Sequence, residues 1–175
     1  MTTGGGPMDP TGPLAPRLRP PRHRVSRRAI GYWTLRAAMG WLVPLAVETV
    51  WLVGDLGHLT AHLIGLVATV VVAAVHVLVM PQWRFRVHRW ETTPEAVYTQ
   101  AGWLNQSRRI APVSRIQTVD TARGPLEQLF GLTNITVTTA SAAGPLKIDG
   151  LDHTTAQRLV DELTTTTQAN PGDAT

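Results

Sequence analysis

Glu48 and His62 are ionisable residues within two long apolar stretches of the sequence. A charged side chain inside a bilayer is costly unless it is neutralised, paired or turned toward the interior of an assembly. If both stretches are helices, counting outward from Leu56, midway between them, places Glu48 at the depth of about residue 64. We therefore expect Glu48 and His62 to form an intramembrane polar pair, either a tolerated hydrogen bond or part of a transport path.

Asp55, His58 and His62 have a spacing that metal ligands can use, because two His at i and i+4 share one face of a helix. No other firm ligand is near them in the sequence, and such spacing recurs by chance. We expect no metal site at this position.

A second group of polar residues follows the apolar stretches and comprises Arg108, Arg109, Arg115 and Gln117. The three arginines could bind lipid headgroups or pair with carboxylates such as those of Asp120, Glu127 and Asp149. Arg115 and Gln117 alternate with apolar residues, so their outward face could bind a protein partner or brace a neighbouring turn. These four residues are the candidate interaction surface.

Several classes of function are excluded by what the sequence contains. There is no Cys, no nucleophile-elbow motif, no Gly-rich phosphate loop leading to Lys, and no pair of carboxylates in the polar half. From residue 81 onward nine basic residues meet nine acidic ones, which is not the charge balance of a nucleic-acid-binding domain. We expect no enzymatic activity, no cofactor and no nucleic-acid partner.

The elements that position these residues begin with two apolar runs, 37–53 and 59–80, separated by five residues. A helix of 22 residues is ~33 Å long, about the thickness of the hydrocarbon core. Arginines flank the outer ends of both runs, whereas Asp55 is the only formally charged residue between them. Because cytoplasmic flanks retain basic residues, we expect a multi-pass protein of the bacterial plasma membrane with both termini in the cytoplasm.

The N-terminal segment is basic and rich in Gly and Pro, so we expect residues 1–31 to be a disordered arm. Its six arginines would bind anionic lipid without headgroup selectivity, at about 1 kcal/mol each. They are Arg17, Arg19, Arg22, Arg24, Arg27 and Arg28.

Short segments of β pattern fill the polar half, which predicts a sandwich or barrel. They are 83–88, 97–101, 107–111, 116–121, 135–139 and 146–149, with one helical turn at 125–130. A 3.6-residue period predicts a closing helix at 154–163. The expected organisation is an arm at 1–31, a transmembrane helical hairpin at 32–80, a mainly β domain at 81–164 and a disordered tail at 165–175, with Leu126, Phe130 and Leu159 buried.

The segment Pro-Val-Ser-Arg-Ile-Gln-Thr-Val-Asp at 112–120, then Gly-Pro-Leu-Glu at 124–127 and Phe-Gly-Leu at 130–132, resembles the signature of the bacterial membrane-anchored PH-like family of YdbS type. The resemblance extends over about residues 17–163. It implies a two-span transmembrane hairpin followed by a PH-like barrel capped by one C-terminal helix, in a family without an established enzymatic activity. It also implies that the partner is another membrane or PH-like protein, or a second copy.

The sequence therefore favours a non-enzymatic membrane-anchored scaffold or interaction module. Two alternatives stay open: a subunit of a transport or resistance assembly that uses Glu48 and His62, and a lipid-sensing module that uses the arginines. Recognition of one phosphoinositide is disfavoured, because the predicted first hairpin at 91–95 is acidic.

Overall fold

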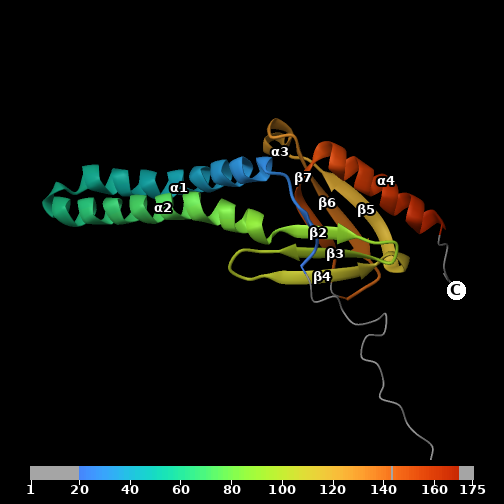
Figure 1. The fold of residues 1–175 in the computed structure, drawn as a ribbon. Coiled ribbons are helices and arrows are strands. Elements are labelled where there is room, and N and C mark those ends of the chain that lie inside the picture. The colour runs from blue at the N-terminus through green and yellow to red at the C-terminus, as the bar shows by residue number, and fades with distance from the viewer. Residues whose placement is uncertain (1–19, 143, 170–175) are drawn as a thin grey trace, which may run out of the picture.

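A computed structural model describes residues 20–142 and 144–169. Two long antiparallel helices project from a domain of two sheets and a C-terminal helix (Figure 1). The helices are α1 (Arg28–Gly54) and α2 (Leu59–Val87), joined by a short 3₁₀ turn, η1 (Leu56–His58). Both are long and apolar enough to cross a membrane.

The outer surface of this hairpin is apolar and exposed. Val43, Val50, Val53 and Leu78 are each about two thirds exposed or more, and only 6% of the most apolar window of either helix is buried. A contiguous apolar surface of this size is characteristic of contact with lipid rather than water. The exposure of these apolar side chains, together with the length and composition of the helices, thus supports a hairpin that spans the membrane.

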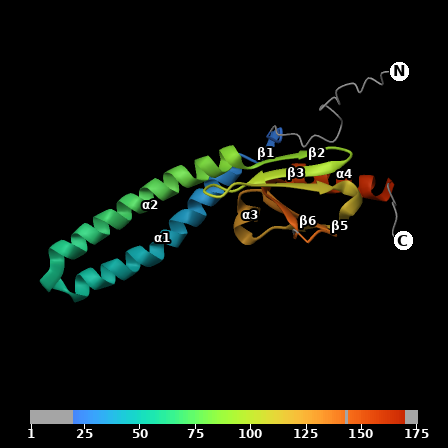
Figure 2. The same cartoon turned by 90° about the horizontal axis from the view of Figure 1, so that it is seen from below.

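The sheet domain contains two antiparallel sheets, seen from a second side in Figure 2. The four-stranded sheet has the order β1 (His23–Arg24), β2 (Arg89–Thr92), β3 (Ala96–Ala101), β4 (Ser107–Pro112). The three-stranded sheet has the order β5 (Ile116–Ala122), β6 (Leu132–Thr139), β7 (Leu146–Asp152). The turn η2 (Val113–Arg115) links the sheets, α3 (Pro125–Leu129) links β5 to β6, and α4 (His153–Ala169) ends the described chain.

One core fills the space between the sheets and α4. Val97, Leu132, Ile135 and Val137 are fully buried within it. Leu159 is 2% exposed, as expected, whereas Leu126 and Phe130 are only partly buried, and Leu129 beside them is 76% exposed.

The N-terminal segment completes this core from the other end of the chain. Val25, Ala29, Tyr32 and Trp33 are buried in the same cluster, and His23 pairs with Trp90 across β1 and β2. The structure therefore differs from the expected arm at 1–31: residues 20–31 form β1 and the start of α1, because their apolar side chains have a core to enter. Residues 1–19 lie outside the described residues.

Two further expectations differ from the structure. Residues 83–87 continue α2 instead of forming a strand: the Trp83 side chain is exposed while Val87 is buried, and the His88 N–H donates to the Arg84 oxygen at 2.8 Å. An alternating pattern of only six residues is too short to distinguish the two-residue period of a strand from the 3.6-residue period of a helix. The two sheets also do not close into a barrel, and α4 extends past the expected tail boundary to Ala169. The predicted fold class, a membrane hairpin followed by a PH-like domain with a C-terminal helix, is confirmed.

Candidate functional site

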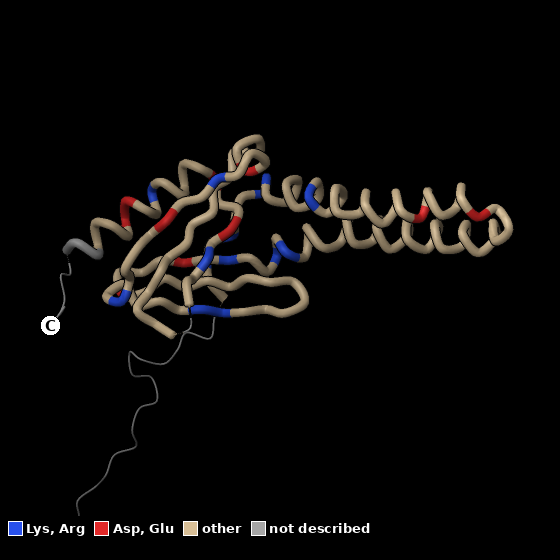
Figure 3. The backbone as a smooth tube through the Cα atoms, turned by 180° about the vertical axis from the view of Figure 1, so that it is seen from behind, with Lys and Arg blue, Asp and Glu red and all other residues tan. Residues whose placement is uncertain are grey.

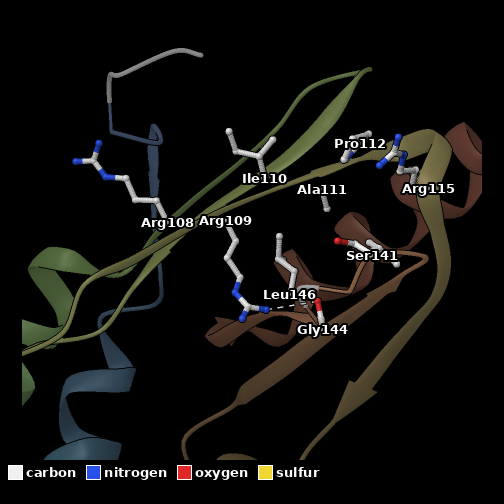
Figure 4. Close-up of a pocket in the computed structure, with 10 residues that line it drawn as sticks. Arg108, Arg109, Ile110, Ala111, Pro112, Arg115, Ser141, Gly144 and Leu146 are labelled. Carbon is white, nitrogen blue, oxygen red and sulfur yellow. Dashed lines mark hydrogen bonds between the residues drawn. The ribbon is translucent and has the colours of Figure 1, made fainter.

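The three arginines of the candidate interaction surface line one pocket of about 300 Å³ (Figure 4). The pocket lies between β4 and the ends of β6 and β7, where the sheets are not joined. Its described lining residues include no carboxylate; they are Arg108, Arg109, Ile110, Ala111, Pro112, Arg115, Thr139, Ser141, Gly144 and Leu146.

Arg109 has a structural role in this pocket. Its Nη1 donates to the carbonyl oxygens of Pro145 at 2.7 Å and Gly144 at 3.4 Å, which fastens β4 to the β6–β7 connection. Arg108 points away from these carbonyls, and Arg115 lies at the opposite end beside Pro112 (Figure 4). The cationic groups are therefore spread along the pocket, which suits an extended ligand better than one compact phosphate.

The carboxylates considered as partners for these arginines have other partners. Asp120 accepts from the Thr118 hydroxyl at 3.1 Å, and Asp149 pairs with Arg84 at 3.5 Å. Glu127 accepts from the Tyr32 hydroxyl at 2.7 Å, and this hydrogen bond lowers the pKa of the Glu127 carboxyl.

β4 is the last strand of its sheet, and its side chains are exposed at every position except Ala111. Ile110 is 53% exposed on this strand. Gln117 does not line the pocket; it lies on β5 at an irregularity of the β5–β6 register between Ile116 and Thr118. The structure thus gathers three of the four candidate residues beside a sheet edge.

The expected intramembrane pair is not formed among the described residues. The Thr69 hydroxyl donates to Oε1 of Glu48 at 2.6 Å, whereas His62 Nε2 lies 3.4 Å from Oδ2 of Asp55. A second hydrogen bond between the helices, from the Trp41 indole to His76 Nδ1 at 2.9 Å, has the same alignment of α1 against α2 as the Glu48–Thr69 pair. Both interhelical pairs are symmetric about a point between His58 and Leu59, because η1 displaces the hairpin centre from Leu56.

The Asp55 carboxylate lies within hydrogen-bond distance of two histidines, His58 at the end of η1 and His62 near the start of α2. His58 Nδ1 lies 2.9 Å from the same Oδ2 that contacts His62, and these hydrogen bonds lower the pKa of the exposed Asp55 carboxyl. Within the described ranges, no group of three or more His, Asp or Glu side chains has an arrangement that could hold a metal ion.

A buried polar junction between α1, α2 and the sheets was missed by sequence reasoning. The Arg84 guanidinium lies 4.5 Å from the centre of the Trp33 ring, and Trp33 packs on His88 with ring centroids 5.2 Å apart. His88 Nδ1 lies 2.9 Å from the Arg84 carbonyl, so this nitrogen carries the proton, and Nε2 faces the Arg84 Nε at 3.4 Å. Burial, and secondly the Arg84 charge, lower the pKa of His88 to about 4.

Some arginines expected to bind lipid make contacts within the protein. Arg22 pairs with Glu91 at 3.5 Å, Arg28 pairs with Asp152 at 3.6 Å, and Arg24 lies over the Phe85 ring at 5.8 Å. Arg27 is exposed, and Arg17 and Arg19 lie outside the described residues.

Comparison with known proteins identifies relatives of the whole arrangement. A family model described as "Bacterial PH domain" matches residues 42–166, which run from α1 into α4. The chain is 28% identical over 155 residues to a protein of Bacillus subtilis (strain 168) named "UPF0699 transmembrane protein YdbS", covering 82% of this chain and 91% of that protein. No solved structure matches significantly.

Proposed function

Because the chain belongs to the bacterial PH domain family, we propose that it is a non-enzymatic interaction module held at the cytoplasmic face of a bacterial plasma membrane. The observation that carries the proposal is the position of β4, the last strand of its sheet among the described residues, beside the arginine-lined pocket. The hairpin supplies the anchor, and the sheet domain supplies the binding surface.

The proposed orientation follows from the distribution of charge. Lys and Arg occur on the sheet domain and on the adjoining ends of α1 and α2, whereas the distal half of the hairpin carries only acidic positions, Glu48 and Asp55 (Figure 3). Because basic residues are retained on the cytoplasmic side of a membrane, this distribution supports a cytoplasmic location for the sheet domain and both termini.

The absence of Cys from the sequence allows a direct test of this orientation. A membrane-impermeant maleimide should label Leu56→Cys in intact cells and Thr164→Cys only after the membrane is permeabilised. Labelling of Thr164→Cys in intact cells would contradict the orientation.

The partner proposed for the β4 edge is an extended acidic segment of another membrane or PH-like protein, or of a second copy. An exposed strand edge offers unpaired backbone groups to an incoming strand. Arg108 and Arg115 at the two ends of the pocket favour a segment with carboxylates, and no described lining residue would repel them.

The test is recovery of the partner from gently solubilised membranes. A photoreactive residue at position 110 should crosslink to the partner, and the double variant Arg108→Glu with Arg115→Glu should lose most of the crosslinked product. Arg158→Glu, a substitution of the same type at an exposed position on α4, should retain it. Undiminished crosslinking by the double variant would refute the proposed surface.

A lipid-sensing role for the same arginines predicts a different result. In nanodiscs, the photoreactive residue at position 110 would then crosslink to lipid in the absence of any other protein, and the yield would rise with the anionic lipid content. Arg109 supports this alternative least, because its guanidinium already donates to two backbone carbonyls.

A second candidate function is assembly through the hairpin, with Glu48 at the contact. Oε2 of Glu48 is buried and has no hydrogen-bond partner among the described residues. Because this oxygen is already buried, a donor from another protein chain could reach it only if the α1–α2 contact around it opened in an assembly, and the transport alternative also requires an assembly.

A further inference from the structure

The connection between β3 and β4, residues 102–106, carries two apolar side chains away from the domain core. Leu104 is 78% exposed and Trp103 is 38% exposed. Gly102 fixes the turn: its φ is +114°, and a Cβ there would lie 1.8 Å from the Asn105 carbonyl oxygen. The loop therefore presents Trp103 and Leu104 from a defined backbone conformation, which a flexible connection would not do.

The Trp103 side chain of this loop lies beside the apolar part of α2. The rings of Trp103 and His76 have centroids 5.8 Å apart. Trp103 joins Trp41, Val75, His76 and Val79 around a pocket of about 470 Å³. Figures 1 and 2 both show the β3–β4 connection extending from the sheet domain toward the hairpin, beside the end of α2 that adjoins the sheets.

The depth of the loop can be judged from the charged residues of the helices. His76 precedes Arg84 by eight residues of continuous helix, so it lies about 12 Å farther from the sheet domain. Arginine at the end of a spanning helix marks the headgroup level. Trp103 is therefore held beyond that level, on the hydrocarbon side.

The residue types of the loop fit this depth. Residues 102–106 contain no charged side chain, and the first basic residues, Arg108 and Arg109, follow on β4. Trp favours the boundary between headgroups and acyl chains, and Leu favours the acyl region. Exposure of both to water would instead be unfavourable.

We propose that the β3–β4 loop inserts into the cytoplasmic leaflet, with Trp103 and Leu104 on the hydrocarbon side of the headgroups. The pocket beside Trp103 is occupied by a phospholipid acyl chain. Acyl chains are the occupant because the pocket is continuous with the lipid-facing surface of α2, where Val72, Val75 and Val79 are more than half exposed. The inference rests on the proposed spanning orientation of the hairpin, and it adds a third point of attachment that fixes the tilt of the sheet domain.

Single cysteines in the full chain test the insertion, because the sequence contains no Cys. Leu104→Cys is labelled with an environment-sensitive fluorophore and the protein is placed in nanodiscs of phosphatidylethanolamine and phosphatidylglycerol. Val75→Cys reports the spanning helix, and Thr164→Cys, exposed on α4, reports the aqueous side. Emission from the label at position 104 should be severalfold higher than at position 164, and lipids spin-labelled near the top of the acyl chain should quench it about as strongly as at position 75.

The controls separate failure of this inference from failure of the proposed orientation. Quenching at position 75 but not at position 104 would overturn insertion of the loop and leave the spanning hairpin intact. Lack of quenching at both positions would overturn both. Crosslinking of Leu104→Cys to a second copy in place of quenching by lipid would show that a protein covers the loop, and this also overturns the inference.

Discussion

A fall in pH from about 7 to about 5 should destabilise the sheet domain through His88. The pKa of His88 is about 4 in the folded protein, against 6.5 for an unperturbed His. Between these values the unfolded chain binds a proton that the folded chain does not, so the free energy of unfolding decreases as the pH falls from 6.5 to about 4. The decrease is about 2 kcal/mol at pH 5 and levels off near 3 kcal/mol below pH 4.

The structural cause is the position of both ring nitrogens. Nδ1 donates to the Arg84 carbonyl and Nε2 faces the Arg84 guanidinium, so a second proton would be placed against a cation in a buried site. Glu127 and Asp152, whose carboxyl pKa values are lowered by hydrogen bonds from Tyr32 and Thr154, lose their contributions only as the pH falls below about 4.5. Their effect is therefore separate from that of His88 at pH 5.

The assay is denaturant unfolding of the full chain in nanodiscs at pH 7 and pH 5, monitored by near-ultraviolet circular dichroism. His88→Phe should be less stable than wild type near neutral pH, because its hydrogen bonds are lost, but should show little further loss at pH 5. His23→Gln, on the exposed strand β1, should keep the wild-type dependence. An equal loss in His88→Phe and wild type between these pH values would refute the assignment to His88.

Three further predictions concern packing and the hairpin. Gly150→Ala should lower the free energy of unfolding by about 1–3 kcal/mol, because φ is +78° and the added Cβ would lie 3.0 Å from the first turn of α1. The control is Gly40→Ala, where nothing lies within 4 Å of an added Cβ. Equal unfolding midpoints of the two variants would contradict the argument. Leu159→Ala should lower the free energy of unfolding by about 2–5 kcal/mol and Phe130→Ala by less, because Leu159 is 2% exposed and Phe130 is only partly buried. A larger loss for Phe130→Ala than for Leu159→Ala in denaturant unfolding would contradict this assignment of the core. Glu48→Gln should leave membrane insertion and partner recovery unchanged, because an amide oxygen also accepts from the α2 hydroxyl; loss of a cellular phenotype with normal recovery at equal abundance would favour transport.

The sequence was sufficient for features encoded locally. Apolar runs of membrane length predicted the hairpin, and the helical spacing of Leu126, Leu129 and Phe130 predicted the turn that forms α3. The closing helix was also predicted from the helical spacing of Ala156, Leu159 and Leu163. All three side chains are buried in the structure. Arg108, Arg109 and Arg115 were singled out for their chemistry, and the structure places them around one pocket.

Features that depend on distant segments could not be predicted. The intramembrane partner of Glu48 was wrong because a displacement of the hairpin centre by less than one turn moves the facing residue to Thr69. The Tyr32–Glu127 hydrogen bond joins residues 95 positions apart, and no local pattern encodes it. The strand expected at 83–88 was wrong because its residues also have favourable neighbours at i and i+4, as Arg84 and His88 show.

The entry of β1 and the first turns of α1 into the domain core has a consequence for biogenesis. Val25, Ala29 and Trp33 are synthesised before the membrane-spanning parts of the hairpin, whereas strands β2 to β7, which bury them, are synthesised after it. The core can close only if the hairpin returns the chain to the side on which it began. A molecule with a single inserted helix or a translocated N-terminus would keep these apolar side chains and the sheets on opposite sides of the membrane. Correct topology is therefore a precondition of folding, and misinserted chains are exposed to proteolysis.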